Sequence, residues 1–144
     1  MSTVQDILRH KGSDVVSMVA DESVVNAARL MNERGIGGVV VMDGGAMVGI
    51  FTERDILRRV VAERRDPATT TIRDVMTSPV TCCPVDTTHD ECMKVMTERR
   101  IRHMPVVQGD EVIGIVTSGD MLAYRVRDQE STIALMKSYV YDNR

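Results

Sequence analysis

The sequence GIFTERD at residues 49–55 is repeated in similar form as GIVTSGD at residues 114–120, with an offset of 65 residues. With this offset, 12 of the 37 residues in 21–57 are identical to their counterparts in 86–122, whereas ordinary residue frequencies give about two by chance. Further upstream, VQDIL at residues 4–8 resembles IRDVM at residues 72–76 with an offset of 68. The chain therefore contains one structural unit written twice.

Each copy predicts the same order of elements. Apolar residues at three- and four-residue intervals predict a helix over residues 21–34. Residues 39–42 and 47–51 are β-branched runs on either side of Asp43-Gly44-Gly45, which predicts a hairpin, and Thr52 can cap a second helix. The second copy predicts a helix over 88–100, strands near 104–107 and 111–116, and a helix from Ser118 to about Arg127.

Three segments follow from this repetition. Residues 1–66 form the first repeat, 67–127 the second and 128–144 a tail, with a proline- and threonine-containing linker over 64–71. The tail predicts a short helix with an apolar face of Ile133, Met136 and Val140, beside Tyr139 and Tyr141. A repeat of about sixty residues buries too little surface to be stable alone, so the two repeats are expected to pack as a pseudo-twofold α/β pair.

Composition restricts the function. The net charge of −3 and pI of about 5.6, without long runs of one sign, argue against nucleic-acid and membrane partners and favour a cytoplasmic protein. Three cysteines without CxxC spacing imply no disulfide framework; Cys82 and Cys83 are either a redox pair or simply buried thiols. GxSxG, HExxH and Walker loops are absent from the sequence, as is a nucleophile with an evident base, so no catalytic or metal-binding residues are predicted.

The repeated GIFTERD and GIVTSGD, together with ERRIRHMPVV at residues 98–107, resemble the CBS repeat, which is named for cystathionine β-synthase. The resemblance covers nearly the whole chain and is strongest to small stand-alone bacterial members. It implies two β-α-β-β-α repeats that bind an adenosine-containing ligand between them and form a flat homodimer.

The resemblance also assigns roles to the motif residues. Asp55 and Asp120 are expected to hold ribose hydroxyls, and Thr52 and Thr117 to lie near phosphate. A threonine followed three residues later by an acid is also an ordinary capping box, and both uses can hold at once. Helix starts also favour phosphate electrostatically.

Residues between the first helix and the hairpin of each copy are the remaining candidates. Arg102 and His103 resemble basic residues that contact phosphate in nucleotide-binding relatives, although a solvated pair is the alternative. The first copy has Gly37 and Gly38 instead, which lack these cations but permit close backbone approach to a larger ligand. By family position, the adenine would lie against Met18, Ile36 and Val40 in the first copy and against Cys82, Ile101 and Pro105 in the second. Four arginines on the closing helices either complete a phosphate site or are simply solvated: Arg58, Arg59, Arg125 and Arg127.

Together these observations predict a non-catalytic sensor that binds AMP, ADP, ATP or NAD, uses no catalytic cofactor, and acts as a homodimer on another protein. The alternative is a ligand-free structural or protein-interaction module that dimerises. Retention of Asp at both motif ends favours the sensor, because a helix start alone would accept Glu, Ser or Asn equally well.

Overall fold

The fold consists of two three-stranded sheets with the same topology. The computed structural model describes residues 1–142, with side chains described through Ser138. In the first sheet, β1 (Ser17–Val19) is parallel to β2 (Gly38–Asp43), which is antiparallel to β3 (Ala46–Thr52). In the second, β4 (Cys83–Pro84), β5 (His103–Gln108) and β6 (Glu111–Thr117) repeat this order. Both predicted hairpins are present, each with a register shift at the same place.

The first long helix of each repeat is set by its caps. Helix α2 (Val24–Arg34) begins three residues later than expected, because the Ser23 side chain accepts the Asn26 N–H and ends the extended chain there. Helix α5 (His89–Arg99) is capped in the same way by Thr88. Both helices end at a left-handed residue, which is Gly35 in the first repeat and Arg100 in the second.

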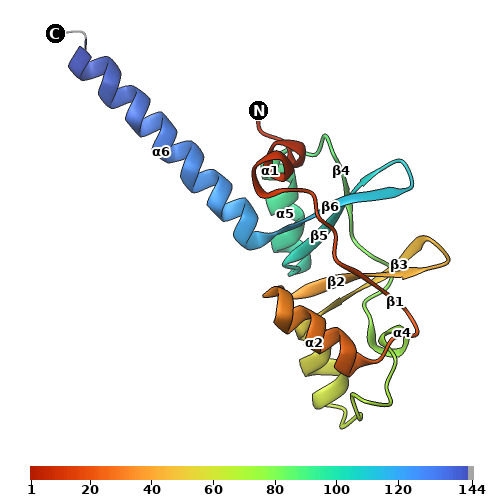
Figure 1. The fold of residues 1–144 in the computed structure, drawn as a ribbon. Coiled ribbons are helices and arrows are strands. Elements are labelled where there is room, and N and C mark those ends of the chain that lie inside the picture. Colours follow the sequence, from red (N-terminus) through yellow and green to blue (C-terminus); the bar gives the residue numbers. More distant parts are fainter. Residues whose placement is uncertain (143–144) are drawn as a thin grey trace.

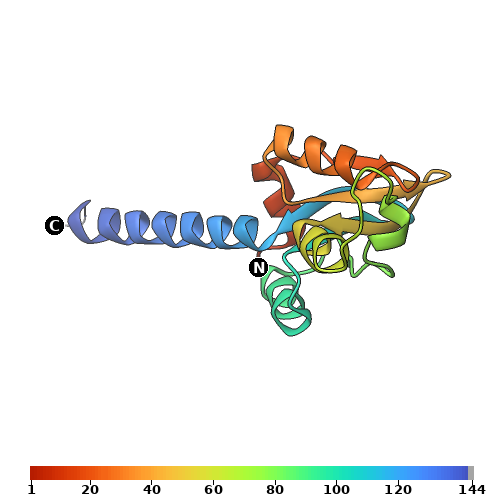
Figure 2. The ribbon, with the colours of Figure 1, turned by 90° about the horizontal axis from the view of Figure 1, so that it is seen from below.

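The closing helices of the two repeats differ. After β3, α3 (Glu53–Asp55) continues into the π-helical turns of η1 (Ile56–Val61), where Val60 is buried while Leu57 and Val61 are exposed. After β6, α6 (Ser118–Asp142) runs for 25 residues and projects from the body of the molecule (Figures 1 and 2). The expected C-terminal helix is present, but it continues the closing helix of the second repeat and is not a separate short element.

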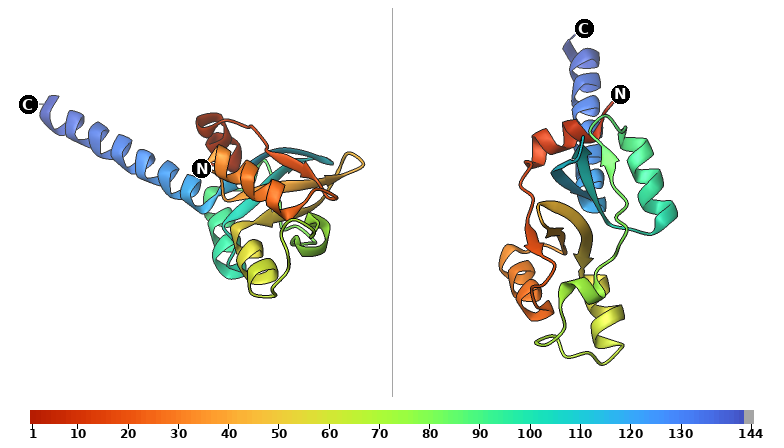
Figure 3. Two further views of the ribbon diagram at one scale, coloured as in Figure 1. Left: turned by 60° about the horizontal axis from the view of Figure 1, so that its bottom comes forward. Right: turned by 90° about the vertical axis from the view of Figure 1, so that its right-hand side faces the viewer.

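The leading helix of each repeat, which is the short helix at its start, packs into the core of the other repeat. Helix α1 (Val4–Lys11) contributes Val4, Ile7 and Leu8 to the core of the second repeat. Helix α4 (Ile72–Val75) contributes its apolar side chains to the core of the first repeat. Figure 3 shows the two helices at opposite ends of the molecule, each beside the sheet of the other repeat.

Two glycines make room for this exchange. A Cβ on Gly114 would lie 2.7 Å from a methyl carbon of Leu8, and a Cβ on Gly49 would lie 2.4 Å from the sulfur of Met76. These glycines occupy the same place in the two copies of the motif. Close contact between strand and exchanged helix therefore explains why each motif begins with glycine, and it connects the two repeats into one folding unit.

Candidate functional site

A cavity of about 580 Å³ lies between the two repeats. The first repeat and the segment before β1 supply one wall, and β5, β6 and the start of α6 supply the other. Its lining includes three cations, three carboxylates, one histidine and several apolar or glycine residues. The residues are Lys11, Gly12, Asp14, Val16, Arg34, Gly35, Ile36, Gly37, Gly38, Glu53, Arg102, His103, Ile115, Thr117, Ser118 and Asp120.

Asp120 lies in this cavity at the start of α6. Its Oδ2 accepts the backbone N–H of Thr117 at 2.9 Å, and its own N–H donates to the Thr117 hydroxyl at 3.1 Å. Lys11 Nζ donates to the same Oδ2 at 2.5 Å and to the Ile115 carbonyl at 2.7 Å. The capping use of the motif is therefore realised, but all of these contacts to the carboxylate involve one of its two oxygens.

The environment of Asp120 favours the charged carboxylate. Burial raises the pKa of Asp120, but hydrogen bonds from Lys11 and Thr117 and the positive charge of Lys11 outweigh that effect, so its pKa lies below the usual value. Within the described residues, the hydrogen bonds from the Lys11 ammonium and the Thr117 backbone N–H both reach Oδ2, and none is found to Oδ1. Asp120 is thus an ionised acceptor with one oxygen free to accept hydroxyl groups from a molecule in the cavity.

Asp55, the counterpart of Asp120, is enclosed by the protein itself. Its Oδ2 accepts the Thr52 N–H at 3.0 Å, and its Oδ1 accepts the Thr77 hydroxyl at 2.8 Å and lies 3.7 Å from Arg59 Nε. The residue is only 5% exposed. Both oxygens are therefore occupied, and neither Asp55 nor Thr52 lines the cavity described above.

The paired glycines of the first repeat face His103 of the second. A Cβ on Gly38 would lie 3.2 Å from the His103 ring, and a Cβ on Gly37 would lie 3.3 Å from the same ring and 2.9 Å from the Glu53 carboxylate. The pseudo-twofold relation places Gly38 opposite its own counterpart, His103. The two glycines therefore allow the His103 side chain of the other repeat to approach closely. From the sequence alone, a larger ligand is expected to make this close approach.

His103 is disfavoured as a cation in this environment. Burial lowers its pKa, and the charges of Lys11 and Arg102 act in the same direction, while Glu53 and Asp120 partly oppose them. The pKa of the imidazole therefore lies below its ordinary value, and a negative charge brought next to the ring, such as a phosphate, would favour its protonation.

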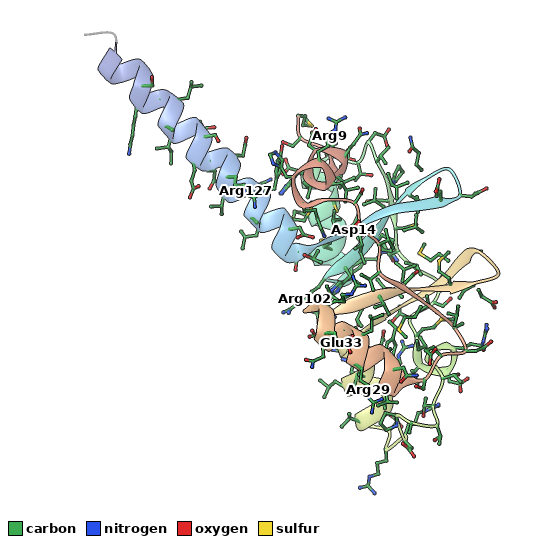
Figure 4. All side chains as sticks on the ribbon, in the orientation of Figure 1. Arg9, Asp14, Arg29, Glu33, Arg102 and Arg127 are labelled. Atoms are coloured by element: carbon green, nitrogen blue, oxygen red, sulfur yellow. The ribbon has the colours of Figure 1, made fainter. Side chains whose placement is uncertain are left out.

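Arg102 is exposed at the mouth of the cavity, where Figure 4 shows it at the junction of the repeats. Arg34, at the end of α2, and Lys11 are the other cations of the lining, and Asp14, Glu53 and Asp120 are its anions. Because the charges balance with His103 neutral, recognition of an anion depends on where the cations lie and not on net charge.

The predicted base-contacting residues separate into two groups. Ile36 lines the cavity, whereas Met18, Val40, Cys82, Ile101 and Pro105 do not. Val40 is buried within the first sheet, Pro105 is buried in β5, and Ile101 packs against the second core. Cys82 is exposed while Cys83 is buried, so the adjacent cysteines face different environments.

The four arginines of the closing helices also lie outside the cavity lining. Arg59 binds the Met76 carbonyl and approaches Asp55. Arg125 binds Asp90 and His89 Nδ1, whose ring is held through Nε2 by the Met121 carbonyl. Arg127 lies on α6 near the end of α1, where it lines a small hollow together with Ile7 and His10 (Figure 4).

Sequence reasoning did not identify Lys11, Asp14, Val16 or Ile115 as candidate residues. Lys11 ends α1, whose position beside the second repeat depends on the exchange of leading helices. The signal found there from the sequence is the similarity between residues 4–8 and 72–76, which identifies equivalent segments but neither their helical structure nor their partners.

Neither a metal cluster nor a membrane-spanning helix is found among the described residues. They contain no cluster of three or more His, Cys, Asp or Glu side chains able to hold a metal ion. None of the helices within residues 1–142 combines the length and apolar character needed to cross a membrane.

Comparison with known proteins supports the resemblance found in the sequence. The sequence model of the CBS domain matches residues 3–62 and 72–127. A solved protein with CBS domains from Burkholderia ambifaria superposes with a TM-score of 0.86 and 38% identity, covering 89% of this chain and 96% of that one. The mitochondrial CBS domain-containing protein CBSX3 of Arabidopsis thaliana is 30% identical over 96% of this chain and 72% of its own length. The CBS domain-containing protein YhcV of Bacillus subtilis is 27% identical over 94% of both chains. None of these three names describes an enzyme.

Proposed function

This chain belongs to the CBS-domain family, and on that premise we propose that it is a non-catalytic regulatory module whose cavity binds an adenosine-containing ligand. The observation that carries the proposal is the Asp120 carboxylate, which lies in a cavity between the repeats with one oxygen free of protein donors. Small-molecule sites typically occupy about 300–1,000 Å³, and this cavity of about 580 Å³ falls within that range.

The lining suggests how such a ligand would lie. Asp120 would accept the ribose hydroxyls, with Thr117 beside it. Arg102 and His103 would hold the phosphate, and Lys11 would leave Asp120 to join them, since an ammonium group on a flexible stem can exchange one anion for another. Ile36, Val16 and Ile115 provide the apolar surface for the base.

The same reasoning proposes one ligand per chain. Both carboxylate oxygens of Asp55 already accept hydrogen bonds from protein donors, so binding at the first motif would require Thr77 and Arg59 to be displaced. The Thr52–Asp55 motif of the first repeat therefore has a structural role and binds no ligand. The alternative of a ligand-free structural module would give this role to both motifs.

Regulation would follow from the position of the cavity. A ligand that contacts both repeats favours whichever relative packing gives it better contacts, and it can shift the equilibrium only by that difference in affinity. The module would act as a cytoplasmic homodimer on a separate regulated protein.

The test begins with the small molecules bound to the purified protein. The protein is denatured, and the released compounds are identified by mass spectrometry. The stripped protein is then titrated calorimetrically with AMP, ADP, ATP, NAD and adenosine. We expect at least one of these to bind at one per chain. Binding of none of the five would contradict the ligand class, and two equivalent sites would contradict the role assigned to Asp55.

A further inference from the structure

Helix α6 carries a stripe of exposed apolar side chains, which Gln129 interrupts. Leu122, Val126, Ile133 and Met136 are 62%, 42%, 53% and 63% exposed, respectively. The contacts of α6 with the body involve Met121, Tyr124 and Arg125 on another face of the helix, including a ring contact of 5.4 Å between Tyr124 and His10.

The stripe has the spacing of a coiled coil. Leu122, Val126, Gln129, Ile133, Met136 and Val140 follow one another at alternating intervals of four and three residues. In heptad terms, Val126, Ile133 and Val140 occupy position a, and Leu122, Gln129 and Met136 occupy position d. The backbone of α6 is helical across this whole segment, although the side chain of Val140 lies outside the described part.

We propose that α6 pairs with α6 of a second copy of this chain as a short parallel two-stranded coiled coil. β-Branched residues at position a, combined with leucine at position d, favour two parallel strands. All three a positions here are β-branched, and one of the three d positions, Leu122, is leucine. This interface is separate from the ligand cavity and does not depend on the proposed ligand.

The polar residue of the stripe favours the parallel arrangement. In a parallel, in-register pair, Gln129 lies opposite Gln129 of the second copy, and the two amides can donate to and accept from each other. In the antiparallel arrangement that overlaps the whole stripe, Gln129 would lie opposite Ile133, which leaves its amide without a partner.

Charges beside the stripe favour the same arrangement. Arg125 occupies position g and Glu130 the following position e, so a parallel pair places Arg125 of each copy near Glu130 of the other. The antiparallel arrangement would bring the two Glu130 side chains together. Arg125 already binds Asp90, but its side chain remains 49% exposed and carries further N–H donors.

The first experiment compares two matched substitutions in the full-length protein by sedimentation equilibrium. Ile133→Lys places a charge in the stripe, whereas Leu135→Lys makes the same change at a residue that is 74% exposed but lies outside it. We expect Ile133→Lys to raise the dimer dissociation constant at least about 100-fold and Leu135→Lys to change it less than about threefold. A persistent dimer in Ile133→Lys, or equal effects of both substitutions, would overturn the proposal.

The second experiment tests orientation by disulfide crosslinking in a Cys82→Ser background, which removes the exposed native thiol. Gln129→Cys should form a covalent dimer on mild oxidation, because parallel pairing brings residue 129 of both copies together. Ser131→Cys, on the outer side of the helix, should not. Absence of the Gln129→Cys dimer, or equal crosslinking at both positions, would overturn the parallel coiled coil even if the chain dimerises.

Discussion

Removing the charge of Asp120 should weaken ligand binding, whereas removing the charge of Asp55 should not. Asp120→Asn and Asp55→Asn are isosteric, so each keeps the shape of its site. A hydrogen bond to a charged acceptor contributes about 1.5–3 kcal/mol, against about 0.5–1.5 kcal/mol for a neutral one. Loss of the charge at Asp120 should therefore reduce the free energy of AMP binding by about 1–1.5 kcal/mol, which raises the dissociation constant about five- to twelvefold.

Asp55→Asn should leave AMP affinity within about twofold of the wild type, because its oxygens accept Thr52 and Thr77 and do not reach the cavity. The assay is calorimetric titration of AMP at 25 °C into each variant, with circular dichroism as the control for folding. Equal losses in the two variants would refute the distinction between an open and an enclosed aspartate. A larger loss in Asp55→Asn would place the ligand at the other end of the pair.

Three further predictions concern the charged groups of the cavity. Arg102→Ala should weaken AMP about tenfold or more while changing adenosine little; equal weakening of both ligands in calorimetry would show that Arg102 does not hold phosphate. Lys11→Met should improve adenosine binding, because the Lys11 ammonium no longer binds the Asp120 carboxylate. The same substitution should reduce the ratio of AMP affinity to adenosine affinity, and an unchanged ratio would show that Lys11 does not hold the phosphate. Because the folded-state pKa of His103 is lowered, the unfolded chain binds more protons, so the free energy of unfolding should fall as pH drops below about 6.5. Over the same range AMP affinity should rise, because the phosphate favours the protonated ring. Urea denaturation and AMP titration at pH 7 and 5 measure both slopes, and His103→Asn should flatten them; slopes that persist in this variant belong to another group.

Local patterns predicted the hairpins and the longer helices of this fold, but not the short helices α1 and α4. The helices, hairpins and motif ends depend on periodicity, turn residues and caps, all of which act over a few residues, so the repeat order and the capping use of Thr117 and Asp120 were visible in the sequence. The C-terminal helix was also expected, but its continuity with the closing helix was not, because the boundary was placed where the similarity between the two copies ends. Arg127 and Asp128 themselves carry no helix-breaking signal, which agrees with one continuous helix.

The difference between the two motifs could not be predicted, because it depends on distant partners. Thr52 and Asp55 have the same local sequence pattern as Thr117 and Asp120. What distinguishes them is the exchanged segment: Thr77 closes over Asp55, whereas Lys11 approaches Asp120 from one side and leaves the cavity open. The contact of Gly38 with His103 is likewise created by the pseudo-twofold relation and has no signature in either copy alone.

The exchange of leading helices also determines when the chain can fold during synthesis. The N–H of Val4 bonds to the carbonyl of Thr87, and Leu8 packs on Gly114, so α1 finds its partners only after roughly 80 to 110 further residues have been made. Domains generally fold as they emerge from the ribosome, and contacts that are distant in sequence form slowly. The first repeat can recruit α4 early, because α4 follows it directly. The apolar face of α1 therefore stays exposed to solvent until the second repeat has been synthesised. During this time the segment depends on protection from aggregation.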